Sequence, residues 1–270
     1  MTDAPLLQMR GIHKSFPGVK ALEDVDLQLH SGEVLALMGE NGAGKSTLIK
    51  ILSGGHRVDS GEILIDGEPV QIHSPQDALR HGIGVIYQEF NLIPSLSVRE
   101  NIFLGREKTV AGFFDRSYEQ QKGSELFRRL GYELDLNAPC RSLTVAQQQL
   151  VEIVKALSQD VRMMIMDEPS AALTGREIQN LFRIIKEMQD QGIGVIYVSH
   201  RLEEIFEVAD RVQVMRDGQM ISNRDMEDVT RALLIEDMVG RTIDSEFPKE
   251  ARQLGPEKLR VEGLRRGEDV

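Results

Sequence analysis

The chain of 270 residues has little cysteine, no tryptophan and few aromatic side chains. Because Cys140 is the only cysteine, no disulfide can form within the chain, and a reducing compartment is compatible with that. No apolar run approaches the roughly 20 residues that are needed to span a bilayer. The N-terminus lacks the basic segment and apolar core of a secretion signal. We therefore expect a soluble, cytoplasmic protein that works at a membrane only through a partner.

The chain also lacks an excess of positive charge, since its formal net charge is −11. Such a balance argues against a general surface for polyanions, so nucleic acid is not an expected partner. The length fits one large domain or two small ones, and it is sufficient to bury a sizeable core.

What the sequence does contain is a phosphate-binding pattern, G-x-x-x-x-G-K-[ST], at residues 39–47. Its residues are Gly39, Glu40, Asn41, Gly42, Ala43, Gly44, Lys45, Ser46 and Thr47. An apolar run at 34–38 precedes it and helical spacing at 48–52 follows, and this strand–loop–helix context distinguishes a phosphate loop from a glycine-rich turn with a solvated lysine. Backbone N–H groups would surround the anion. Lys45 would reach the β- and γ-phosphates, and the Ser46 hydroxyl would bind Mg²⁺.

The rest of the chain predicts an α/β protein. Antiparallel strands are predicted at 6–12, 25–30 and 61–72, and buried strands at 83–87, 163–166, 193–198 and 212–215. Helices are predicted near 97–104, 117–130, 146–158, 175–191, 201–207 and 226–239. The alternation implies a mainly parallel sheet covered on both faces, with a helical insertion at 89–158 and a hairpin turn at 217–218.

Polar residues follow three of the predicted buried strands. In a doubly wound sheet, ligands bind at the carboxyl ends of the strands, which places Asp167 beside the phosphate loop, where it suits Mg²⁺. Glu168 could orient or deprotonate an attacking water. Gln88 could reach the metal or that water, and His200 could hydrogen-bond the γ-phosphate. Each also has a plain structural reading, as a strand-end turn, a loop residue or a packing histidine.

Thr144 and Gln147 stand three residues apart at the start of the apolar pattern of 146–158. Threonine followed at that spacing by glutamine is a capping box, which would by itself account for both side chains. The same helix N-terminus could present amides and the Thr144 hydroxyl to a phosphate. The residue pattern does not choose between these two readings.

Taken together, these motifs resemble those of the ATP-binding subunits of ATP-binding-cassette (ABC) transporters. In chain order they are Walker A (39–47), the Q-loop (Gln88), the signature (143–147), Walker B (163–168), the D-loop (170–174) and the switch histidine (His200). The resemblance implies a P-loop NTPase core of the RecA type, an antiparallel β-subdomain and an inserted helical subdomain. It further implies that Phe16 stacks on adenine, although an aromatic in a strand-end turn could simply be a core residue.

Three runs, at 14–22, 147–153 and 199–205, look like bacterial monosaccharide importers of the ribose, xylose and galactose type. In that family one polypeptide carries two cassettes. A short echo fits this, because LQMRGI at 7–12 is similar to LRVEGL at 259–264. We therefore expect a cassette over 1–240, a linker over 241–256 and the start of a second, truncated cassette over 257–270.

The resemblance implies an ATPase that uses ATP and Mg²⁺ to power sugar import at the cytoplasmic face of the membrane. Its partners would be a second cassette, an integral-membrane permease and, indirectly, a sugar-binding protein outside the membrane. The sequence differs from the usual family pattern in two motifs that would complete the ATP site of a partner cassette. Val145 and Ala146 replace signature glycines, and Thr174 replaces the usual aspartate of the D-loop. Import of another solute such as a nucleoside, a non-transport cassette ATPase, a small-molecule kinase and a non-catalytic cassette are the alternatives.

Overall fold

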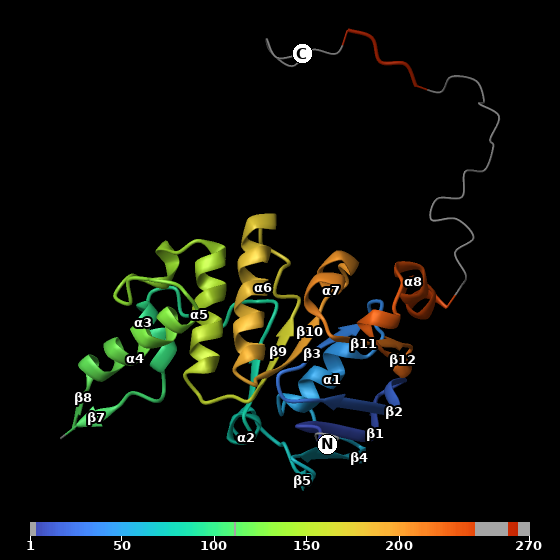
Figure 1. The fold of residues 1–270 in the computed structure, drawn as a ribbon, viewed down its shortest axis with the longest axis horizontal. Helices are drawn as coiled ribbons and strands as arrows, with labels where there is room; N and C mark the ends of the chain where they lie inside the picture. The colour runs from blue at the N-terminus through green and yellow to red at the C-terminus, as the bar shows by residue number, and fades with distance from the viewer. Residues whose placement is uncertain (1–3, 111, 241–258, 264–270) are drawn as a thin grey trace.

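Two β-sheets and the helices around them make up the core of the computed structural model, which describes residues 4–110, 112–240 and 259–263 (Figure 1). The larger sheet has six strands in the order β12-β11-β3-β10-β9-β6. These strands are β3 (Val34–Met38), β6 (Ile83–Ile86), β9 (Met163–Asp167), β10 (Gly194–Val198), β11 (Arg211–Arg216) and β12 (Gln219–Asp225). Five of them run parallel, and β12 pairs antiparallel with β11 across the predicted turn at Asp217 and Gly218.

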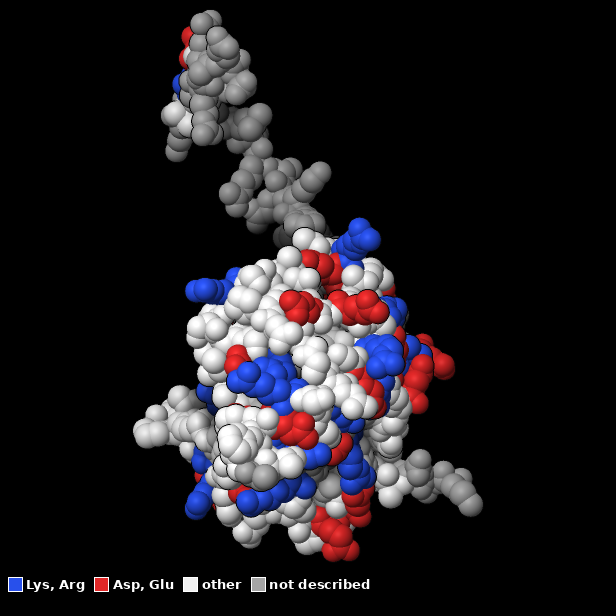
Figure 2. Space-filling view, turned by 90° about the vertical axis from the view of Figure 1, so that its left-hand side faces the viewer, with Lys and Arg blue, Asp and Glu red and all other residues white. Residues whose placement is uncertain are grey.

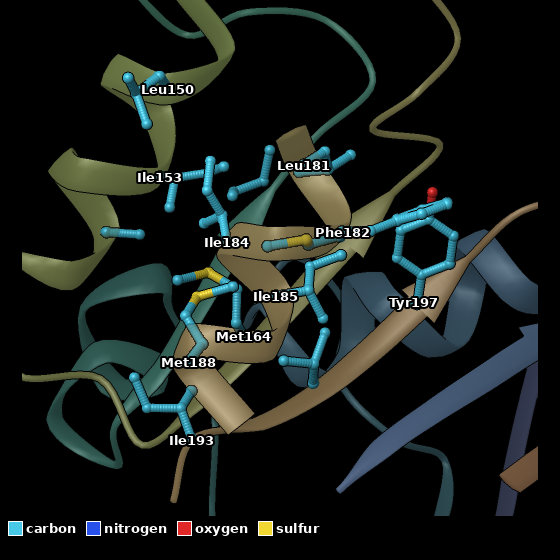
Figure 3. Close-up of a cluster of buried hydrophobic side chains, with 14 of the residues drawn as sticks. Leu150, Ile153, Met164, Leu181, Phe182, Ile184, Ile185, Met188, Ile193 and Tyr197 are labelled. Atoms are coloured by element: carbon cyan, nitrogen blue, oxygen red, sulfur yellow. The ribbon is translucent and has the colours of Figure 1, made fainter. Parts of the chain in front are cut away.

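Helices or a second sheet cover both faces of the six-stranded sheet, as we predicted from the uninterrupted apolar runs of its strands. Along β3, Val34, Ala36 and Met38 enter one hydrophobic cluster, and Leu35 and Leu37 enter the other, because successive side chains of a strand point to opposite faces. The first face carries α5 (Val145–Leu157), α6 (Gly175–Asp190) and α7 (Leu202–Val208). Figure 3 shows the apolar side chains of α6 packed over β9 and β10.

The second face carries α1 (Lys45–Leu52) and the smaller, antiparallel sheet. That sheet has the order β2-β1-β4-β5, with β1 at Leu7–Phe16, β2 at Val19–Leu29, β4 at Ser60–Ile65 and β5 at Glu68–Val70. The predicted antiparallel strands and the predicted α/β class are therefore confirmed. One short helix, α2 (Pro75–Arg80), was not predicted, and Ser74 caps it by accepting a hydrogen bond from the amide of Asp77.

Three helices gather at one end of the molecule, on the left of Figure 1. They are α3 (Val98–Phe103), α4 (Arg116–Arg129) and α5, at the positions expected from the helical spacing. A hairpin of two short strands, β7 (Thr109–Val110) and β8 (Phe113–Phe114), lies between α3 and α4 and was not predicted. Figure 2 shows this end, where basic and acidic side chains are mixed. The limits of 89–158 as a subdomain remain a prediction.

The last predicted helix, 226–239, is wrong at its start. Residues 226–228 form a 3₁₀ turn, and α8 covers Arg231–Val239 because Thr230 caps it by accepting a hydrogen bond from the amide of Leu233. The predicted linker at 241–256 lies outside the described residues. Of the predicted second cassette at 257–270, only residues 259–263 are described, and they take part in no strand. No helix in the described part of the chain is long and apolar enough to span a membrane.

Candidate functional site

The predicted phosphate loop connects the buried strand β3 to α1, and two of its glycines are required by their surroundings. A Cβ atom on Gly39 would lie 2.3 Å from the carbonyl oxygen of Met215, so that β11 leaves no room for a side chain. Gly44 has φ of +105°, and a Cβ there would lie 2.8 Å from the carbonyl oxygen of Ala21 on β2. The loop is thus fixed between the two sheets.

Lys45 begins α1 and folds back over its own loop. Its Nζ donates hydrogen bonds to the carbonyl oxygens of Gly39 at 2.6 Å and Glu40 at 3.1 Å. Burial lowers the pKa of Lys45, and the nearby carboxylates of Glu168 and Asp167 oppose that shift. The ammonium group is therefore held where the loop would surround a phosphate, with three donors and a partly desolvated charge.

The other loop residues follow the strand–loop–helix geometry. Ser46 and its hydroxyl are exposed in the first turn of α1, and Thr47 is half-buried one residue further. Asn41 and Gly42 are exposed at the tip of the loop. Ala43 is buried, and its carbonyl oxygen accepts a hydrogen bond from the amide of Gly218, which ties the loop to the β11–β12 turn.

An open cleft lies beside this loop, with a volume of about 640 Å³. Its lining residues are Gly39, Glu40, Asn41, Gln88, Glu168, His200 and Met238. They come from the carboxyl ends of β3, β6, β9 and β10 and from α8. The structure thus brings Gln88, Glu168 and His200 to the phosphate loop, at the sheet edge where strand order predicted a ligand site.

Glu168 and His200 contact each other directly at the edge of this cleft. Nδ1 of His200 lies 2.8 Å from a carboxylate oxygen of Glu168. The Glu168 side chain is largely buried, whereas that of His200 is 65% exposed. The backbone of Glu168 has φ of +51°, a region that non-glycine residues rarely adopt, and its amide donates to the carbonyl oxygen of Val198. Strain of this kind is common at functional sites.

Asp167 ends β9 opposite Val198 of β10, one residue before Glu168. Burial raises the pKa of the Asp167 carboxyl, the Glu168 carboxylate raises it further, and Lys45 and Lys50 oppose both effects. A cation bound beside Asp167 would offset the cost of keeping this carboxylate charged and partly buried.

The residues present fit a magnesium site of the P-loop type. Among the described residues, no group of three or more His, Cys, Asp and Glu side chains converges as in a self-contained metal centre. Mg²⁺ at phosphate-binding sites needs only one or two protein oxygens together with substrate phosphates. The hydroxyl of Ser46 and the carboxylate of Asp167 supply oxygen ligands of that kind. The side-chain amide of Gln88 lines the cleft beside the phosphate loop and offers a further oxygen.

Phe16 ends β1 next to the turn that leads into β2, and its ring is partly exposed. The ring of His56 meets it edge-on, with the centroids 5.2 Å apart, and Nζ of Lys14 lies 5.6 Å from its centroid. Phe16 is therefore not a core residue, and its adenine-stacking role stays a prediction.

Thr144 and Gln147 do not line the cleft around the phosphate loop. The Thr144 hydroxyl accepts from the Gln147 amide at 3.3 Å, and the Gln147 side-chain oxygen accepts from the Thr144 amide at 3.0 Å. The predicted capping box is confirmed, and it accounts for both side chains within this chain.

Sequence reasoning missed two contributors to the site. Met238 of α8 closes one side of the cleft, and nothing in the pattern of α8 separates it from a core methionine. Glu204 of α7 is 5% exposed and accepts hydrogen bonds from Ser170, two residues after Glu168, and from Ser199, one residue before His200. The only feature of the sequence that points to Glu204 is its position four residues after His200 on an amphipathic helix. An acidic side chain at such a position is normally expected to face solvent.

Comparison with known proteins agrees with this geometry. Residues 22–171, more than half of the chain, match the sequence model of the ABC transporter family. The ribose import ATP-binding protein RbsA 1 of Rubrobacter xylanophilus is 52% identical over 97% of this chain and 53% of its own length. A putative ribose/galactose/methyl galactoside import ATP-binding protein 2 of Burkholderia lata is 49% identical over 96% of this chain and 49% of its own. The chain spans about half the length of these curated relatives.

Solved structures give the same picture. The ADP conformation of an ATP-binding cassette of an ABC transporter superposes with a TM-score of 0.76 and 25% identity, covering 88% of this chain and all of the other. The cbiO1 protein of Clostridium perfringens, part of the ABC transporter complex cbiONQ, gives 0.73 and 26%, covering 90% of this chain and 96% of its own. The predicted P-loop fold is therefore confirmed, and the chain belongs to the ABC transporter family.

Proposed function

We propose that this chain binds and hydrolyses ATP to power the import of a monosaccharide through a membrane permease. The observation that carries the proposal is the cleft beside the phosphate loop, where Glu168 contacts His200 and lies close enough to interact electrostatically with Lys45. Such a constellation is suited to phosphoryl transfer, in which positioning and charge stabilisation supply nearly all of the catalysis. The proposal of a sugar as cargo draws on the printed names of the relatives in Rubrobacter xylanophilus and Burkholderia lata.

Each side chain in and around this cleft has a proposed role. Lys45 and the loop amides hold the β- and γ-phosphates, and Phe16 packs against the adenine. Glu168 orients the attacking water and accepts its proton, while His200 fixes the carboxylate and donates toward the γ-phosphate. When bound, Mg²⁺ supplies charge neutralisation at the phosphates, and Ser46, Asp167 and Gln88 would hold it.

A second cassette would complete the site. Thr144 lies at the exposed N-terminus of α5, away from the cleft of its own chain, and the helix dipole makes such a terminus attractive to an anion. We propose that it faces the phosphate loop of a partner cassette, either in the same full-length polypeptide or in a dimer. Val145 is 39% exposed beside it, so the substitution of a signature glycine leaves a small apolar side chain at that interface.

The permease would dock on the loop that follows Gln88. Ile93 is 40% exposed there, and a groove lined by Tyr87, Asn91, Glu152 and Lys155, with apolar residues of α2 and β6, lies next to it. The Asn101 side chain pins the loop, since it accepts from the amide of Ile93 and donates to its carbonyl oxygen. A rigid apolar loop suits a docking surface.

The direct test is ATP hydrolysis by the assembled transporter in proteoliposomes. Each purified solute-binding protein of the organism would be added with ribose, xylose, galactose or a nucleoside. Stimulation by a monosaccharide-loaded binding protein is the expected result. Stimulation by the nucleoside alone would contradict the cargo but not the ATPase, and the absence of ATP hydrolysis under every condition would contradict both.

A further inference from the structure

A buried carboxylate ties together the two loops that carry Glu168 and His200. Glu204 lies on the first turn of α7 with 5% of its surface exposed. Oε2 accepts hydrogen bonds from the hydroxyls of Ser170 at 2.7 Å and Ser199 at 3.1 Å. It also accepts one from the phenol of Tyr197 at 2.8 Å. Three hydroxyl donors therefore meet on one carboxylate oxygen.

The second carboxylate oxygen of Glu204 also has a hydrogen-bond partner. Oε1 accepts from Nη1 of Arg201 at 3.2 Å, and the Arg201 amide donates to the Ser199 hydroxyl at 3.1 Å. Burial raises the pKa of Tyr197, so its phenol stays a donor at neutral pH. In Figure 3 the Tyr197 ring lies next to Phe182 of α6, which anchors this end of β10 in the core.

Two of these donors belong to the loops that carry Glu168 and His200. Ser170 stands two residues after Glu168, and Ser199 stands one residue before His200. Both serines are buried, with exposures of 1% and 0%. Because one carboxylate oxygen binds both, the separation of the two loops is set by Glu204 and not only by the 2.8 Å contact between His200 and Glu168.

We propose that Glu204 is a positioning residue for ATP hydrolysis, which holds the Glu168 loop and the His200 loop at the separation that catalysis requires. The proposal rests on the catalytic roles given above to Glu168 and His200. Glu204 itself touches neither nucleotide nor water in this scheme, since its carboxylate points into the core. A shift of the two loops by a fraction of an ångström would misplace the water-orienting carboxylate, and misplacement by about 1 Å can cost about a hundredfold in rate.

The test compares serine-to-alanine variants that each lose one hydroxyl–carboxylate hydrogen bond. Ser170→Ala removes the link to the Glu168 loop, and Ser199→Ala removes the link to the His200 loop. The matched control is Ser222→Ala, which removes the 2.6 Å bond from Ser222 of β12 to Asp237 of α8. Each would be made in the protein at its natural length, and ATPase kcat, the KM for ATP and the thermal midpoint would be measured.

The expected result is a fall in kcat of about tenfold in Ser170→Ala and Ser199→Ala, with the KM for ATP unchanged. Ser222→Ala should lose a similar amount of thermal stability and keep its kcat. The proposal is overturned if all three variants lose stability alike and keep full kcat, or if KM changes in place of kcat. If one of the two serine variants fails to fold, kcat and KM of the other variant test the proposal. If Glu168→Gln retains full hydrolysis, the catalytic assignment fails separately, whatever the serine variants do.

Discussion

Nδ1 of His200 lies 2.8 Å from the carboxylate of Glu168, and the two side chains line the cleft beside the phosphate loop. Their positions follow from neighbouring parallel strands, since Glu168 directly follows β9 and His200 follows β10 by two residues. In this arrangement the imidazole restrains the carboxylate that would orient water. The contact also fixes which ring nitrogen remains available, because Nδ1 faces Glu168 and Nε2 is left for a phosphate oxygen.

Glu168→Gln should abolish most ATP hydrolysis and preserve ATP binding. Glutamine keeps the size and one acceptor but cannot take a proton from water, and general-base catalysis contributes about a hundredfold or more. Turnover and retained radiolabelled ATP after gel filtration would be measured together. Glu207→Gln, an exposed position on α7, is the control. A Glu168→Gln protein that turns over at the control's rate would remove Glu168 from the mechanism.

Asp167→Asn should make the protein more stable and less active. The folded-state pKa of Asp167 is raised, chiefly by burial and then by Glu168. Above the folded pKa this charged group therefore costs stability, and the cost disappears as pH falls toward the unfolded value. We expect the thermal midpoint at pH 7 to rise by roughly 2 °C.

The same substitution should weaken Mg²⁺-dependent ATP hydrolysis, because a neutral amide is a poorer ligand for this cation. The gain in stability should shrink as pH is lowered through the raised pKa of Asp167, which a series of melting curves would reveal. Asp228→Asn, at an exposed position in the 3₁₀ turn, is the control. A lower midpoint for Asp167→Asn at pH 7 would show that its charge stabilises the fold.

Gly44→Ala should damage the phosphate loop far more than Gly42→Ala. Both glycines have positive φ, and strain from an added Cβ costs about 1 to 2 kcal/mol at either site. At Gly44 the Cβ would also lie 2.8 Å from the carbonyl oxygen of Ala21, whereas at Gly42 nothing lies within 4 Å. Overpacking typically adds about 1 to 3 kcal/mol.

Urea unfolding and ATP affinity would measure both effects of the glycine variants. Gly175→Ala, in open space at the start of α6, is the third member of the series and should change neither quantity. Equal losses of stability in Gly42→Ala and Gly44→Ala would mean that the approach of β2 to the loop does not restrict it.

Elements that are long or carry a fixed sequence motif could be predicted from the sequence, and very short elements could not. The strand at 34–38 and the phosphate loop were predictable because an apolar run and a fixed motif coincide, and Asp217-Gly218 because few residues adopt its turn. The hairpin β7–β8 could not be predicted, since its strands have two residues each and Phe113 is 80% exposed. Periodicity needs more residues than such an element contains.

Some residues of the site could likewise be predicted from the sequence, and others could not. Lys45, Asp167 and Glu168 were identified because strand ends and motif spacing place them, and the structure brings them to one edge of the sheet. Glu204 was missed because its burial is a tertiary property: hydroxyls from two other segments surround it, and no local pattern encodes that. Resemblance alone suggested Phe16, and its partly exposed ring is compatible with that suggestion.

Ile93→Asp should uncouple transport from ATP hydrolysis without loss of nucleotide binding. The neighbouring Leu92 is a poorer position for this test, because it packs against the core and its substitution would report on folding. Ile93 is 40% exposed, so a charge there should hardly affect stability yet disfavour an apolar interface.

Val239→Asp is the matched control for Ile93→Asp, since Val239 has 39% exposure at the end of α8. Solute uptake by proteoliposomes and ATP turnover would be compared for both variants. We expect Ile93→Asp to lose most uptake and the control to retain it, with equal melting temperatures. Unchanged uptake in Ile93→Asp would move the docking surface elsewhere, and the groove bounded by Tyr87 and Lys155 would be the next part of this face to test.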